Sequence, residues 1–96
     1  MDKEELQAVR NLCCAVVEQA IIDYKQALKF LLLEQAVDSH FQLKDTEKEQ
    51  GNEHWRMKQT CEYFFRHNEL CRLVVRYNPQ KVIHHIRKQV LELCEM

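Results

Sequence analysis

A stripe of apolar residues at helical spacing dominates the first third of this 96-residue chain. Its members recur every three or four residues: Leu6, Val9, Cys13, Val16, Val17, Ala20, Tyr24, Ala27, Leu28 and Leu31. Asp2, with Glu5 three residues later, resembles the capping pattern that opens a helix. We therefore predict a first helix from about residue 3 to about residue 40. Such a helix is roughly 55 Å long, so we expect part of it to protrude, bend or pack on another molecule.

The remaining chain favours an all-α fold. The sequence holds one Gly and one Pro, too few for the turns of a β-rich protein, with 46% hydrophobic and 30% charged residues. No run of about 20 apolar residues is present, so we expect no membrane span. The prediction is a single domain over residues 1–96, a small bundle of three to four helices with a long N-terminal helix.

Helix start signals divide the second half of the sequence. Asn68 is a good N-cap, and Asn78 followed by Pro79 is a strong helix start. We predict a helix over about 53–66 antiparallel to the first, a short helix over about 69–77 and a last helix over about 79–94. The polar, charged residues 42–52 form the linker, and Asn52 or Thr46 is expected to cap the helix after it.

The apolar spacing also predicts a core. Its expected members are Tyr24, Leu28, Phe64, Phe65, Val74, Ile83, Ile86 and Val90. Glu62 is interpreted as a lone acid on a charged face, together with Glu69.

Three apolar residues near the end of the first helix lie off its main stripe: Phe30, Leu33 and Val37. One interpretation is that later helices cover this end on two sides. The other is a surface patch, because large exposed apolar patches mark interaction sites. Few residues are left to cover the three, so we predict that they contact another chain, either a second copy or a host protein.

Charge is divided between the two halves. Residues 1–53 hold 6 Lys/Arg and 11 Asp/Glu, a net charge of −5, whereas residues 54–96 hold 8 and 4, a net charge of +4. The halves could attract each other or form solvated faces. The alternative is contact with a polyanion such as nucleic acid, for which clustered cations are needed. The candidate residues are Arg66, Arg72, Arg76, Lys81, Arg87 and Lys88.

No catalytic or metal-binding pattern stands out. His67, Cys71, His84 and His85 lack the paired ligand spacing of a zinc site, and no nucleophile–base arrangement is recognisable. We predict a protein that is not an enzyme and has no cofactor. Five cysteines without a C-x-x-C pair, several on apolar faces such as Cys13, Cys61 and Cys94, predict free thiols in a reducing cytoplasm.

Three segments resemble a family of small helical proteins encoded by prophages and mobile elements of Firmicutes. The first matches at Glu18, Gln19, Ala20, Asp23, Tyr24, Ala27 and Leu28, and the second at Cys61, Glu62, Phe64, Phe65 and Arg66. The third is the run from Val82 to Lys88. About half the chain is covered. His67-Asn68 and Asn78-Pro79 stand where the family usually has a Ser and an Asp-Gly turn.

The resemblance implies a bacterial, cytoplasmic protein that acts by binding. The first expectation is an anti-defence inhibitor, such as an anti-CRISPR protein, that covers a surface of a host effector. A nucleic-acid-binding regulatory or accessory protein that uses the basic half is the second. A structural or assembly factor is the third. The expected partner is a host or phage protein, with a homodimer as a further option.

Overall fold

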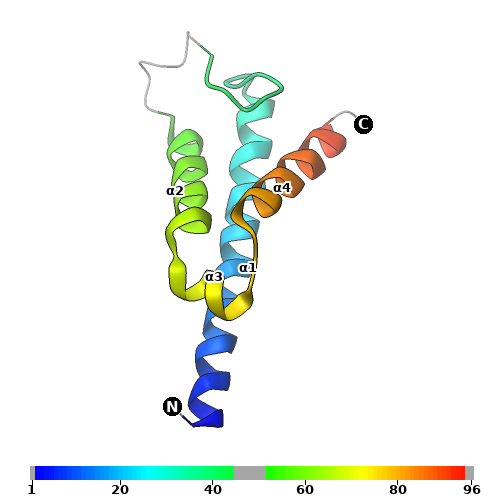
Figure 1. Ribbon diagram of the computed structural model, residues 1–96. Helices are drawn as coiled ribbons and strands as arrows, with labels where there is room; N and C mark the ends of the chain where they lie inside the picture. The colour runs from blue at the N-terminus through cyan, green and yellow to red at the C-terminus, as the bar shows by residue number, and fades with distance from the viewer. Residues whose placement is uncertain (1, 45–51, 95–96) are drawn as a thin grey trace.

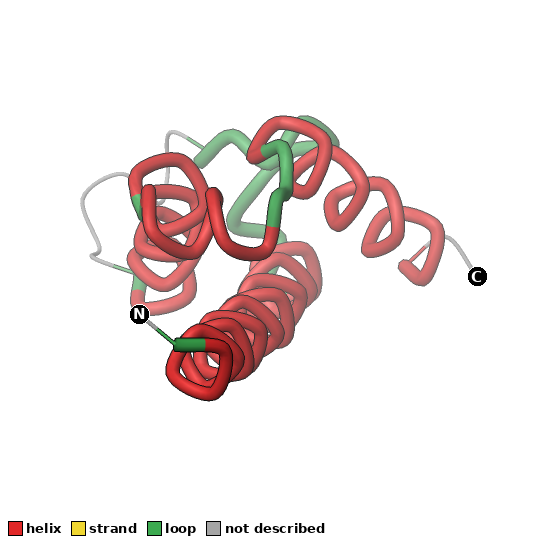
Figure 2. Tube along the Cα trace, turned by 60° about the horizontal axis from the view of Figure 1, so that its bottom comes forward, coloured by secondary structure: helices red, strands yellow, loops and turns green. Residues whose placement is uncertain are grey.

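The computed structural model describes residues 2–44 and 52–94, and it confirms the all-α fold. Its helices are α1 (Lys3–Leu33), α2 (Glu53–His67), α3 (Glu69–Val75) and α4 (Pro79–Cys94). α2 runs antiparallel to α1, α3 crosses beside α1, and α4 turns back and diverges from α1 (Figure 1). Viewed obliquely along α1, α2 and α4 lie over one side of that helix and leave the other side open (Figure 2). The described residues include no strand, only a bridge between Val37 and Leu43.

Side-chain caps open the helices where the sequence predicts them. Asp2 accepts a hydrogen bond from the backbone N–H of Glu5 at 2.8 Å. Asn52 accepts from the N–H groups of His54 and Trp55. Asn68 caps α3 and Asn78 caps α4 in the same way. Each cap satisfies a backbone donor that has no partner within the helix, so the predicted starts of these helices are correct.

The predicted end of the first helix is wrong. α1 stops at Leu33 because Gln35 adopts a left-handed backbone with φ of 58°. The N–H of Ala36 then bonds to the carbonyl of Leu31, and that of Gln35 to the carbonyl of Leu32. These bonds form a Schellman motif, which usually has Gly or Asn at the left-handed position. Gln35 gave no such signal in the sequence.

The chain after Gln35 folds back over the end of the bundle. Asp38 accepts hydrogen bonds from the N–H groups of His40 and Gln42, and Lys44 donates its N–H to the carbonyl of Ala36. Ala36, Val37 and Phe41 are buried in the main core. Residues 42–44, predicted as linker, belong to this turn, while 45–51 lie outside the described residues.

Most of the predicted core is correct. Tyr24, Leu28, Phe65, Ile83, Ile86 and Val90 are buried in one cluster. Phe64 and Val74 are only half-buried. Phe64 lies at the boundary with a second cluster, formed by Cys13, Val17 and Cys71 between α1 and α3, and Val74 lies at the margin of that cluster.

The N-terminal end of α1 projects beyond the other helices. α3 packs against α1 at Cys13 and Val17, and the helix continues past that level (Figure 1). The molecule is accordingly elongated, with extents of 53 × 30 × 17 Å. Leu6 and Leu12 are exposed there. The expectation that part of the first helix protrudes is confirmed.

Candidate binding surfaces

A buried carboxylate fixes how α1, α2 and α4 meet. Glu62 on α2 is 7% exposed. Its Oε2 accepts hydrogen bonds from Tyr24 Oη of α1 at 2.5 Å and from Arg87 Nη2 of α4 at 2.7 Å. Arg87 Nε also donates to Tyr24 Oη at 3.0 Å, and Lys58 Nζ lies 3.1 Å from the same carboxylate oxygen. Glu62 is therefore not a lone surface acid but the junction of three helices.

The surroundings of Glu62 keep it ionised. Burial disfavours the charged carboxylate, but hydrogen bonds from Tyr24 and Arg87 and the charge of Lys58 outweigh it, so the pKa of Glu62 lies below its ordinary value. Burial also raises the pKa of Tyr24, helped by the hydrogen bond to Glu62. Lys58 lies over the Trp55 ring, 4.4 Å from its centroid. These groups satisfy one another's hydrogen bonds and charges, so the cluster connects α1, α2 and α4.

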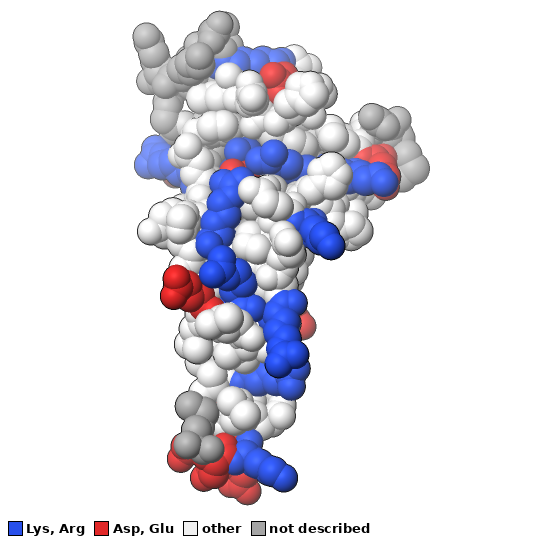
Figure 3. Space-filling model, in the orientation of Figure 1, with Lys and Arg blue, Asp and Glu red and all other residues white. Residues whose placement is uncertain are grey.

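The six Lys and Arg residues predicted to contact a polyanion differ in burial and in their partners. Arg87 is half-buried and committed to Glu62, and Arg66 lies 3.9 Å from the other oxygen of that carboxylate. Arg72 is half-buried, whereas Arg76, Lys81 and Lys88 are exposed. Lys81 and Lys88 flank a shallow hollow on α4 together with His84 and His85. Lys and Arg side chains run down the visible face, and acidic side chains gather at the end of α1 (Figure 3).

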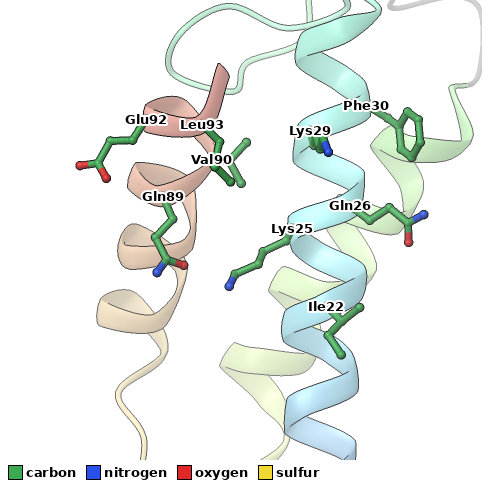
Figure 4. Close-up of a pocket in the computed structure, with 9 residues that line it drawn as sticks. All are labelled: Ile22, Lys25, Gln26, Lys29, Phe30, Gln89, Val90, Glu92 and Leu93. Carbon is green, nitrogen blue, oxygen red and sulfur yellow. The ribbon is translucent and has the colours of Figure 1, made fainter. Parts of the chain in front are cut away.

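A groove of about 800 Å³ lies between α1 and α4. It forms because α4 diverges from α1 toward its C-terminal end (Figure 1), and Val90 is the last buried residue of α4. Ile22, Phe30 and Leu93 supply exposed apolar surface. Figure 4 shows Lys25 extending from α1 toward α4 and Val90 pointing toward α1, with Glu92 directed away from the groove. An apolar groove with a few polar groups is the usual form of a binding site.

Two lysines of α1, Lys25 and Lys29, line the groove. No carboxylate in the described ranges forms an ion pair with Lys25 or Lys29. Ile22 and Leu93, which line the groove, were not predicted as site residues. Ile22 shares a helix face with Gln26, Lys29 and Leu33, at intervals of four, three and four residues, and this spacing was the available signal.

The predicted patch of Phe30, Leu33 and Val37 is wrong as a unit. Val37 is 4% exposed, because the left-handed turn at Gln35 carries it back onto the core. Leu33 is exposed, and Phe30 is partly covered by His54, whose ring stacks on it at 4.9 Å between centroids. His54 in turn pairs with Glu34 at 2.9 Å. Phe30 and Leu33 thus remain on the open side of α1, and Val37 does not.

The cysteines are free thiols. Burial raises the pKa of both Cys61 and Cys71 to about 11, so neither is a thiolate at neutral pH. Cys94, which the sequence places on an apolar face, is exposed. Within residues 2–44 and 52–94, no cluster of three or more His, Cys, Asp or Glu is placed to hold a metal ion. None of the helices described is long and apolar enough to cross a membrane.

Comparison of the chain with protein-family models, curated protein sequences and solved structures found no match.

Proposed function

We propose that this protein acts by binding another protein in the groove between α1 and α4. The groove itself is the observation that carries the proposal: it exposes Ile22, Phe30 and Leu93 on two rigid helices. The buried charged groups of the described residues, Lys58 and Glu62, are in contrast paired within the fold. Binding needs only such a shaped apolar surface, whereas catalysis needs reactive groups aimed at a substrate.

The groove fits an amphipathic helix with acidic residues beside its apolar face. A helix of this kind would bury its apolar side on Ile22 and Leu93. Its carboxylates would meet Lys25 and Lys29, which form no ion pair with a carboxylate of residues 2–44 and 52–94. An inhibitor that covers a surface of a bacterial defence effector, as an anti-CRISPR protein does, is a narrower form of this function and rests on the resemblance to prophage-encoded proteins.

A pull-down from a bacterial lysate tests the proposal. Leu93→Glu places a carboxylate in the groove and is expected to abolish retention of the partner. Tyr63→Glu alters an equally exposed site on the outer side of α2 and is expected to retain it. Circular dichroism should show unchanged helix content in both variants, because Glu is a good helix former. Retention of the same partner by Leu93→Glu would contradict the proposal.

Nucleic-acid binding is the second candidate, and the exposed cations of α3 and α4 favour it. Arg76, Lys81 and Lys88 are exposed, and basic side chains gather on the face of the molecule that Figure 3 shows. Phosphate contacts release counterions, so affinity for duplex DNA should fall steeply with salt. Replacing Lys81 and Lys88 by Gln should reduce that slope by about two. Binding that is absent at low salt would exclude this candidate.

A further inference from the structure

The projecting end of α1 and the outer side of α3 together expose a second apolar surface, separate from the groove. On α1 it comprises the exposed residues Leu6, Leu12 and Val16 and the half-buried Val9, at intervals of three, three and four residues along the chain. Leu12 is 66% exposed, and Leu70 and Leu73 on α3 are 60% and 70% exposed. α3 packs on α1 at Cys13 and Val17, so the exposed side chains of α3 lie beside the base of the projecting segment. We call the exposed side of residues 69–76 the ledge.

Opposite charges mark the two ends of this surface. The first turn of α1 carries Asp2, Glu4 and Glu5 against a single cation, Lys3. The ledge carries Arg72 and Arg76, with Glu69 as its one acid. Figure 3 shows acidic side chains at the tip of α1 and basic side chains above them. A partner with a basic end and an acidic end, joined by an apolar stripe, would complement this surface.

We propose that the partner for this surface is a second copy of the chain, bound in antiparallel orientation about a two-fold axis near Val9 and Arg10. An axis there places residues 2–5 of one copy beside residues 14–17 of the other. That is the level at which α3 packs on α1. The acidic first turn of each copy therefore meets Arg72 and Arg76 of its partner, while the two apolar stripes pack on each other.

Self-complementarity distinguishes a second copy from an unrelated partner. A two-fold interface uses the same patch on both subunits, so the patch must carry both members of each complementary pair. This surface does so: apolar stripe against apolar stripe, and acidic tip against basic ledge. The paired segments extend about 20 Å along α1. Ile22, Lys25 and Leu93 lie away from the pairing, so the groove stays open in the dimer.

Sedimentation equilibrium across about 1–200 µM tests the pairing. The wild-type mass should double with concentration. Leu12→Glu should raise the dissociation constant at least about tenfold, and Leu73→Glu, on the ledge, should act in the same direction. Ile22→Glu, an exposed site on the same helix within the groove, is the matched control and should dimerise normally. Circular dichroism of each variant checks that its helix content is unchanged.

Charge exchange tests the register. Glu4→Arg and Arg76→Glu should each weaken association, and the double variant should recover most of the loss, because the swapped charges again face each other. A wild-type chain that stays monomeric throughout would overturn the proposal. Association that Ile22→Glu abolishes and Leu12→Glu preserves would also overturn it, since the groove would then hold the second copy.

Discussion

Two parts of α1 carry the same apolar spacing and meet different surroundings. Around Tyr24, Leu28 and Leu31, the stripe is covered by α2, α4 and the turn at residues 36–44. At Leu6 it faces solvent. The difference follows from length: α1 has 31 residues and spans about 46 Å, whereas the 15 residues of α2 span about 22 Å. The periodicity of a stripe specifies a helix, and the later elements decide whether anything in the same chain covers it.

The largest contrast between the two parts should appear on truncation of apolar side chains. Phe65 is fully buried against Tyr24, with ring centroids 5.7 Å apart. Phe65→Ala should lower the free energy of unfolding by about 4 kcal/mol, because it removes buried surface and leaves a cavity. Leu6→Ala, at the exposed end, should change it by less than about 0.5 kcal/mol. Urea denaturation at low protein concentration measures both, and equal losses would show that the projecting end is part of the core.

The buried carboxylate gives the next largest effect. Glu62→Gln leaves Lys58 and Arg87 without their common anion, and we expect a loss of about 3 kcal/mol in the free energy of unfolding. Glu92→Gln is the matched control, because Glu92 is exposed on α4 and points away from the groove (Figure 4). We expect the free energy of unfolding to fall strongly for Glu62→Gln and to change little for Glu92→Gln, which would show that the contacts of Glu62 stabilise the fold. Equal losses in the free energy of unfolding for the two variants would mean that burial of Glu62 adds nothing to stability.

The stabilisation by Glu62 should also depend on pH, and this is a smaller effect. The pKa of Glu62 is lower in the fold than its ordinary value of 4.5, so the unfolded chain binds this proton at a higher pH. The stabilisation is present above the ordinary value and is lost as the pH falls through the lower, folded pKa. Wild-type stability should therefore fall more steeply with acid than that of Glu62→Gln. Asp38, whose pKa is also lowered, is present in both chains, and parallel curves would contradict the assignment.

The sequence was sufficient for the fold class, the helix starts and most of the core. Asn52, Asn68 and Asn78 are strong local signals, because a capping side chain acts within one turn of its own position. The end of α1 was missed because Gln35 is neither Gly nor Asn, and that error also misplaced Val37. Burial of Glu62 was missed because Tyr24 and Arg87 lie 38 and 25 residues away in sequence. The groove depends on the divergence of α4, which no local pattern encodes.

Amide hydrogen exchange along α1 at two protein concentrations tests most directly the claim that one part of this helix holds the fold and the other serves a partner copy. Between about 1 µM and 100 µM, amides of residues 7–16 should slow at least about tenfold, because pairing removes local opening of the projecting end. Amides of residues 20–31 should exchange slowly and show a much smaller change. Rates for residues 7–16 that do not depend on concentration would contradict the claim.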